Sequence, residues 1–306
     1  MSRHKTTMRD IARECNVSVA TVSYVLNHSE KERISHETRL KIMETATRLH
    51  YELHVSGEPR LKNQSRLVAI IVNLKVENCS SKKLMFYDLA SELSNQLKLS
   101  GFQTILINSK NLSEDVSFTT RHHPDALFII DADDTVTEQF TKDYYIPILF
   151  LDCENNNPLF CKIHPDYSDL VNQAKHMLHD EYPFLILEDI CNIPIRNQFL
   201  DWFLPTDIFI NTPGSDLTCF LRNHKDQTGI VIGDILGMQV EQYFRSDSLV
   251  IISSLGNTSL IRSDIKKLYV RNKEKAIIAS NILNEMLLLD YSAENENRIL
   301  LKASLK

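Results

Sequence analysis

The feature that most constrains this chain is a run of three short helical patterns near its N-terminus, over residues 8–49. Thr7 stands three residues before Asp10, the spacing of a capping box at the start of a helix. Ser18 precedes a second helix over about residues 19–26, and Ser35 precedes a third. Apolar residues recur at helical spacing in each: Ile11 and Ala12; Val22, Val25 and Leu26; Ile42, Ala46 and Leu49. Two helices joined by a tight turn of about three or four residues suit a helix-turn-helix.

The outer face of the second helix carries no acidic side chain. Its residues are small or neutral-polar: Val19, Ala20, Thr21, Ser23, Tyr24 and Asn27. A helix that lies in the major groove of DNA needs such a face, because short side chains allow close approach and carboxylates would repel phosphates. Hydroxyls and amides can read base edges there. The alternative is a three-helix bundle with a solvated face, but such a face usually carries Lys and Glu.

These positions also resemble a known family. The pattern D-I-A-x-x-x-x-V-S-x-x-T-V-S-x-V-L-N, followed by S-x-x-T-R and L-H-Y, is similar to the N-terminal signature of the LacI/GalR repressors. The resemblance implies that Val19, Ala20 and Tyr24 contact base edges. It also implies a set of residues that position the head on the DNA backbone: Ser18, Thr21, Ser23, Asn27 and Thr38. Arg9 completes the expected DNA-binding set.

Charge is distributed unevenly along the chain. Residues 1–66 hold twelve Lys and Arg against eight Asp and Glu, a net charge of +4. The whole chain carries −6, so residues 67–306 carry −10. A basic head on an acidic body is typical of a phosphate-binding module attached to a separate domain. We therefore expect double-stranded DNA as the partner of the head.

Composition points away from membranes and disulfides. The chain has no run of about 18 apolar residues, and its polar start is not a signal peptide. The cysteines form no CxxC pair and predict free thiols in a reducing cytoplasm: Cys15, Cys79, Cys153, Cys161, Cys191 and Cys219. No P-loop, GxGxxG, GxSxG or HExxH motif occurs. We expect no cofactor, no metal and no enzyme activity.

From residue 67 the chain alternates between strand and helix patterns, which predicts βαβ units. The run L-V-A-I-I-V-N opens this part and is typical of a strand buried on both faces of a parallel sheet. Further strands are expected over residues 103–108, 126–130, 146–152, 184–187, 208–210, 230–232, 249–252 and 298–302, and helices over 84–99, 167–179 and 273–289. The predicted fold class is α plus α/β: a helix-turn-helix domain followed by a two-lobed, doubly wound, periplasmic-binding-protein-like domain. Its expected parts are the helix-turn-helix domain (1–51), a linker with a degenerate hinge (52–66), a first lobe (67–165) and a second lobe (166–306) that returns to the first.

The body resembles the effector domain of the LacI/GalR family, which holds a small ligand between its two lobes. Asp152 and Arg196 match two of the four polar anchors of that family. Asp234 follows a glycine where the family has an Asn-Asp pair, and the last aspartate is missing. These three residues either bind a polar ligand or act as strand-end caps and surface ion pairs. With two anchors absent, we predict that the cleft does not bind a common sugar in the family's usual way.

Two other groups favour a structural role. His122-His123 and the pair Cys161 and His164 lack a partner set at zinc spacing. The aromatic group Phe199, Trp202 and Phe203 favours core packing over ligand stacking.

The linker departs from the family pattern. There, a Y-x-P-N and A-R-x-L sequence forms a hinge helix on DNA whose leucine wedges into the minor groove. Here Gly57 costs such a helix about 1 kcal/mol and Pro59 about 3 kcal/mol more. We predict that residues 52–62 do not form this helix and that Leu61 wedges poorly.

The sequence thus predicts a DNA-binding transcription regulator, in the simplest case a repressor, on a pseudo-palindromic operator. A homodimer is expected because one recognition helix reads only a few base pairs. One alternative stays open: a DNA-binding regulator whose degenerate effector domain binds a partner protein or no small molecule, or has another activity. The identity of any small-molecule effector also stays open.

Overall fold

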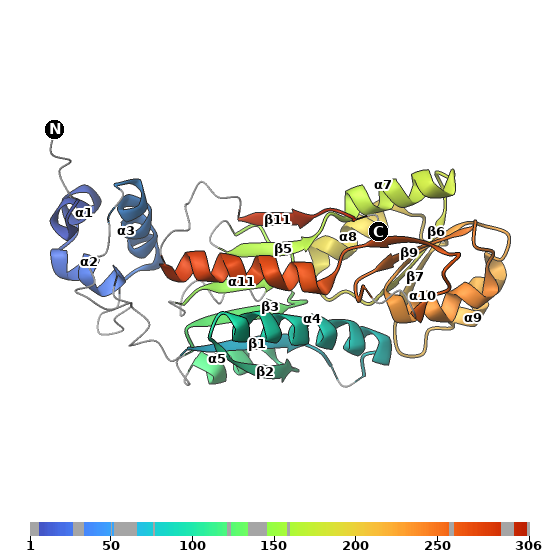
Figure 1. The fold of residues 1–306 in the computed structure, drawn as a ribbon, viewed down its shortest axis with the longest axis horizontal. Helices are drawn as coiled ribbons and strands as arrows, with labels where there is room; N and C mark the ends of the chain where they lie inside the picture. The colour runs from blue at the N-terminus through green and yellow to red at the C-terminus, as the bar shows by residue number, and fades with distance from the viewer. Residues whose placement is uncertain are drawn as a thin grey trace.

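A head and two α/β lobes follow one another along the long axis of the computed structural model (Figure 1). The structure describes residues 6–26, 34–49, 51, 66–75, 77–120, 124–133, 146–157, 160–256, 260–288 and 297–304. This architecture confirms the predicted fold class. Residues 52–65 of the linker lie outside the described part, so the predicted loss of the hinge helix stays a prediction.

The head consists of α1 (Met8–Cys15), α2 (Val19–Leu26) and α3 (His36–Arg48). Asp10 stabilises the start of α1, because its Oδ2 accepts hydrogen bonds from the Thr7 N–H at 2.9 Å and the Thr7 hydroxyl at 2.7 Å. Asn16 ends α1 in the left-handed conformation, with φ 58°, and turns the chain toward α2. The three helices pack around fully buried apolar side chains: Ile11, Val22, Leu26 and Ile42.

Lobe 1 contains a parallel six-stranded sheet in the order β11-β5-β4-β3-β1-β2. Its strands are β1 (Leu67–Asn73), β2 (Gln103–Ser109), β3 (Ala126–Ile130), β4 (Ile148–Leu151), β5 (Cys161–Pro165) and β11 (Arg298–Leu301). The helices α4 (Ser80–Leu99) and α11 (Asn272–Leu288) pack against each other on one face, and α5 (Leu112–Thr120) covers the other. Burial on both faces explains the uninterrupted apolar runs of β1, β3 and β4.

Lobe 2 contains a parallel five-stranded sheet in the order β10-β9-β8-β6-β7. Its strands are β6 (Phe184–Glu188), β7 (Ile208–Asn211), β8 (Gly229–Ile232), β9 (Leu249–Ser253) and β10 (Lys266–Tyr269). One face is covered by α7 (Tyr167–Leu178) and α8 (Ile193–Trp202), and the other by α9 (Leu217–Asn223), α10 (Asp234–Val240) and the 3₁₀ turn η2 (Glu241–Tyr243). Phe199 and Phe203 are buried in this core, as the favoured interpretation of the aromatic group expects.

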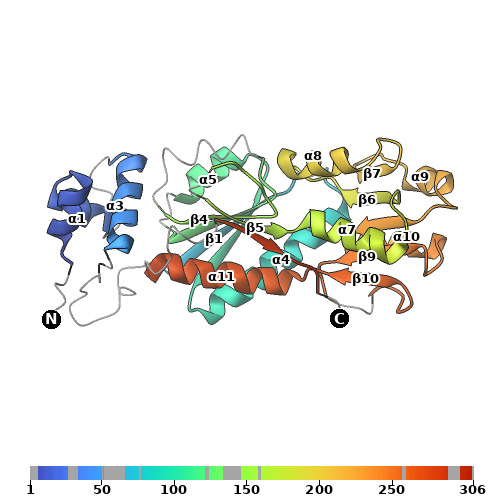
Figure 2. The same ribbon diagram turned by 90° about the horizontal axis from the view of Figure 1, so that it is seen from above.

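The chain passes between the lobes three times. It crosses between β5 and α7, between β10 and α11, and after β11, where Ser304 bridges to Tyr269. One apolar core therefore extends through both lobes. Figure 2 shows α11, late in the chain, lying beside lobe 1. None of the helices in the described residues is long and apolar enough to span a membrane.

Two strands, β5 and β10, escape the sequence patterns. Charged residues interrupt the apolar run of β5, although the strand is fully buried. Lys162 Nζ donates to the carbonyl oxygens of Asn155 at 3.0 Å and Asn157 at 3.1 Å. His164 Nε2 lies 3.1 Å from Glu154 Oε2. Such pairing lets polar side chains occupy a buried strand. The expectation that His164 binds no metal stays a prediction, and His122 and His123 lie outside the described residues.

Aspartates end two neighbouring strands where the chain has few glycines. Asp131 follows β3 with φ 56°, and Asp152 follows β4 with φ 52°. Asp tolerates this left-handed region better than most residues. Because the carboxyl ends of parallel strands meet at one edge of the sheet, both carboxylates are brought to the edge of lobe 1 that faces the cleft.

Candidate DNA-binding surface and effector cleft

The start of α2 presents small, uncharged side chains. Val19 and Ala20 are exposed, and Thr21 and Ser23 are half-buried. The whole helix, VATVSYVL, contains no charged residue. Ser18 caps it, because its Oγ accepts from the Thr21 N–H at 2.9 Å and lies 2.7 Å from the Thr21 hydroxyl. An exposed helix start of this kind can approach phosphates and base edges without charge repulsion.

The other predicted DNA-binding residues differ in accessibility. Tyr24 is half-buried and packs against the core of the head. Arg9 is exposed on α1. Thr38, half-buried near the start of α3, has its hydroxyl 2.8 Å from that of Ser35. Asn27 lies outside the described residues.

A cleft lies between the two lobes and is lined mostly by apolar side chains from both, including Met85, Phe86, Tyr167, Leu187, Ile190 and Ile232. The volume within which the centre of a water molecule can move is about 50 Å³. That space admits about four water molecules. The lobes are therefore closed on one another, and little room is left for a ligand.

Asp152, a predicted ligand anchor, lines this cleft but is already paired. Lys275 Nζ, in the first turn of α11, donates to its Oδ1 at 2.6 Å and Oδ2 at 2.8 Å. The Lys275 side chain is 3% exposed and that of Asp152 12%. A sugar hydroxyl could reach this carboxylate only by competing with a buried ammonium group.

Asp234 and Arg196, the other predicted anchors, lie elsewhere. Asp234 is the first residue of α10 and its side chain binds the end of β9, because its oxygens accept from the Ser253 hydroxyl at 2.5 Å and the Ser254 N–H at 2.9 Å. It lines a second, smaller cavity. Arg196 on α8 lines neither cavity, and its NH1 is 4.0 Å from Asp189 Oδ1. The structure does not gather the three anchors into one site.

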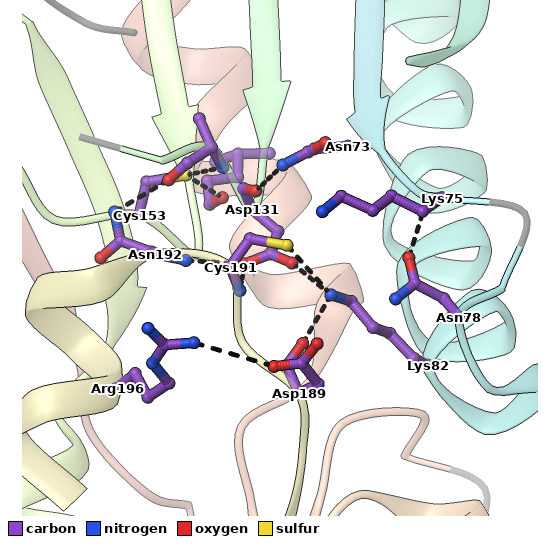
Figure 3. A network of polar contacts seen from close by, with 12 residues as sticks. Asn73, Lys75, Asn78, Lys82, Asp131, Cys153, Asp189, Cys191, Asn192 and Arg196 are labelled. Carbon is purple, nitrogen blue, oxygen red and sulfur yellow. Dashed lines mark hydrogen bonds and ion pairs between the residues drawn. The ribbon is translucent and has the colours of Figure 1, made fainter. Parts of the chain in front are cut away.

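A buried polar network joins the lobes beside the cleft (Figure 3). Lys82 Nζ of α4 lies 2.8 Å from Asp131 Oδ2 and donates to the Asp189 carbonyl at 2.5 Å. Asp131 Oδ1 accepts from the Cys191 N–H at 2.9 Å and the Asn192 N–H at 3.3 Å. Lys82 and Asp131 belong to lobe 1 and residues 189–192 to lobe 2. We call Lys82, Asp131 and residues 189–192 the interlobe latch.

Burial and the Lys82–Asp131 interaction together shift the pKa values of these two side chains. Burial raises the pKa of Asp131 to about 6, and it outweighs the opposing effects of Lys82 and the two backbone N–H groups. Burial by itself would lower the pKa of Lys82, but the Asp131 carboxylate reverses this and the pKa is raised. Lys82 therefore stays protonated, while Asp131 takes up a proton near pH 6.

The family of the head follows from its sequence. Residues 7–52 match the model of the bacterial regulatory proteins, lacI family. The head is a LacI-family DNA-binding domain. The chain is similar to two relatives described as HTH-type transcriptional regulators: pepR1 of Lactobacillus delbrueckii subsp. lactis, 24% identical over 183 residues, and RegA of Clostridium acetobutylicum, 34% identical over 65 residues. The matched parts cover 58% and 21% of this chain, but only 53% and 19% of those proteins.

Two solved structures of transcriptional regulators share the fold of the whole chain. The transcriptional regulator CelR in complex with cellobiose superposes with a TM-score of 0.62 and 14% identity, covering 99% of this chain and 98% of that one. The lac repressor dimer bound to operator and the anti-inducer ONPF gives 0.61 and 16%, covering 98% and 97%. At such identities the likeness establishes the fold of the lobes and not their ligand.

Sequence reasoning misses the groups that fill the cleft of the two-lobed body. Lys82 and Lys275 lie on helices, where a lysine ordinarily indicates a solvated face. Asp131 and Glu188 each directly follow a predicted strand, and that position could have pointed to the cleft edge. In the described residues, no group of three or more His, Cys, Asp and Glu side chains could hold a metal ion.

Proposed function

We propose that this protein regulates transcription, as a repressor, by binding a pseudo-palindromic operator as a homodimer. The observation that carries the proposal is the uncharged, exposed start of α2 within a LacI-family head. Its small side chains suit the major groove, and one such helix reads too few base pairs for high affinity alone. A symmetric dimer supplies the second half-site.

The proposed roles are those that the resemblance to the LacI/GalR signature implies. Val19 and Ala20 stand where close approach is easiest, and the exposed edge of Tyr24 completes the base contacts. The residues proposed to position the head on phosphates are Arg9, Ser18, Thr21, Ser23, Asn27 and Thr38.

Exposed apolar side chains of lobe 1 support the proposed dimer. Strand β2 is an edge strand, and its Ile105 and Leu106 are exposed. Leu84 and Leu99 of α4 are exposed too, Leu99 at 82%. Exposed apolar side chains on an unpaired edge favour burial against a second copy. Sedimentation analysis of the Leu106→Asp variant tests this, since the wild type should sediment as a dimer and the variant as a monomer.

The cleft supports an effector response unlike that of a sugar-binding regulator. Of the three predicted effector contacts, Asp152 and Asp234 line the cavities but are satisfied within the protein, and Arg196 lines neither cavity. Each lost hydrogen bond to a ligand costs about 1 kcal/mol. We therefore propose that common sugars do not bind in the cleft.

Binding to the DNA upstream of the protein's own reading frame is the decisive test. In a gel shift at ~0.15 M salt, the wild type should bind this DNA much more tightly than random duplex. Ala20→Asp places a carboxylate on the DNA-facing side and should abolish the shift. Gln239→Asp, exposed on α10, adds the same charge to the body and should leave it intact. Equal affinity for promoter and random DNA would exclude a specific regulator.

A further inference from the structure

The polar groups that line the cleft are almost all satisfied within the protein. Asp152 is paired with Lys275, and Asp131 with Lys82. Asn272 donates from Nδ2 to Asp88 Oδ2 at 2.9 Å. A ligand that needs many hydrogen bonds would therefore have to break existing ones.

Glu188, at the end of β6, is the exception. Its side chain is buried at 4% exposure and lines both the larger and the smaller cavity. One oxygen, Oε2, accepts from Asn211 Nδ2 at 2.9 Å. The other, Oε1, is buried and has no hydrogen-bond partner. A buried carboxylate oxygen without a donor is costly and is expected to gain one when a suitable ligand is bound.

The balance of charge around the cavities gives the sign of that ligand. Four carboxylates line them, those of Asp131, Asp152, Glu188 and Asp234. Two lysines face these groups, and both are committed: Lys275 to Asp152, and Lys82 to the interlobe latch, toward which Figure 3 shows it directed. Asp234 is compensated by hydroxyl and N–H donors. Glu188 is therefore the carboxylate that has neither a paired cation nor a donor to both oxygens, although the Lys82 charge also acts on it.

The apolar lining and the small volume of the larger cavity indicate the other properties of the ligand. Half-buried Met85, Tyr167 and Ile232 line the larger cavity with apolar surface. Its volume of about 50 Å³ to the centre of a water-sized sphere holds about four or five heavy atoms. A disaccharide is much larger than this space.

We propose that the cleft binds a small alkylammonium ion, whose ammonium group donates to Glu188 Oε1 and whose alkyl chain lies against Met85, Tyr167 and Ile232. This inference rests on the proposed function, because it names the effector class of the same cleft. A neutral alcohol of the same length fills the same space but leaves the carboxylate without a cation. Charge, and not only shape, therefore selects the ligand.

Calorimetric titration of the full chain with n-butylammonium chloride tests this. We expect a saturable isotherm, with n-butanol and glucose at least tenfold weaker. Glu188→Gln keeps the shape of the side chain and should weaken n-butylammonium binding at least tenfold. Glu181→Gln, exposed just before the same strand, should leave it unchanged. Equal binding of the amine and the alcohol to the wild type, no binding of the amine, or full binding by Glu188→Gln would overturn the proposal.

A gel shift on the same preparations separates this inference from the proposed function. Specific DNA binding without amine binding overturns the ligand class alone. Amine binding without specific DNA binding overturns the regulator and leaves the cation site. The comparison of amine with alcohol uses only the wild-type protein, so it decides the question even where Glu188→Gln does not fold.

Discussion

Lys275 and Asp152 show how single residues decide what the cleft accepts. Each would be a buried, uncompensated charge without the other. We predict that Lys275→Met lowers the free energy of unfolding by about 3–5 kcal/mol. The double variant Lys275→Met/Asp152→Asn should recover most of this loss, because it removes the second charge and keeps a residue that tolerates the left-handed backbone at position 152. Urea denaturation measures both. As a control, Lys273→Met changes an exposed lysine two residues earlier on α11 and should change stability little. A double variant as unstable as the single variant would contradict a compensating ion pair.

Tyr24 is the residue that we expect to set the base preference of the head. Its half-buried ring leaves part of the side chain free to reach a base edge. Replacing it with arginine, which binds guanine O6 and N7 as a fork, should shift preference toward guanine at one position in each half-site. Binding to a library of operator variants gives the readout. Tyr182→Arg, exposed in lobe 2, controls for the added charge, and an unchanged base preference would remove Tyr24 from the readout.

At the scale of elements, the linker is the segment whose local sequence opposes the family's hinge helix. Gly57 and Pro59 disfavour a helix there by about 4 kcal/mol together. We predict that the bound operator is bent little, because no wedge offsets the cost of unstacking bases. A circular-permutation assay measures the bend, with Leu204→Ala in lobe 2 as the control. A large bend that collapses in Leu61→Ala would show that the wedge operates despite its sequence.

At the scale of the whole molecule, Asp131 of the interlobe latch should make the stability of the folded protein depend on pH. The pKa of Asp131 is raised from 3.8 to about 6 in the folded protein. Between these values the folded state binds a proton that the unfolded state lacks, so this group should add stability as pH falls from about 7 to about 4. Its contribution is at most about 3 kcal/mol.

Urea unfolding of the wild type and of Asp131→Asn at pH 7.5 and pH 5.0 tests this, because the variant lacks the titrating carboxyl group. The gain in stability at the lower pH should be smaller in the variant than in the wild type. Comparing the two pH differences cancels the groups that titrate in both proteins. The same pH dependence in both would contradict the raised pKa of Asp131.

The sequence by itself determined the head, the alternation of strands and helices, and the fold class. These features depend on short-range physics: capping at Thr7 and Ser18, apolar spacing in α2, and apolar runs that only a doubly covered parallel strand tolerates. The resemblance to the LacI/GalR signature rests on the same short stretch, and the family match covers that stretch and no more.

Only the tertiary structure decided what fills the cleft. Lys275 and Asp152 are 123 residues apart and meet because α11 returns to lobe 1 after the chain has built lobe 2. Lys82 and Glu188 look like ordinary polar residues until α4 and the end of β6 are brought together. Buried electrostatics depends on which charges meet after the crossings and on how much water they lose, and neither quantity is encoded in local periodicity.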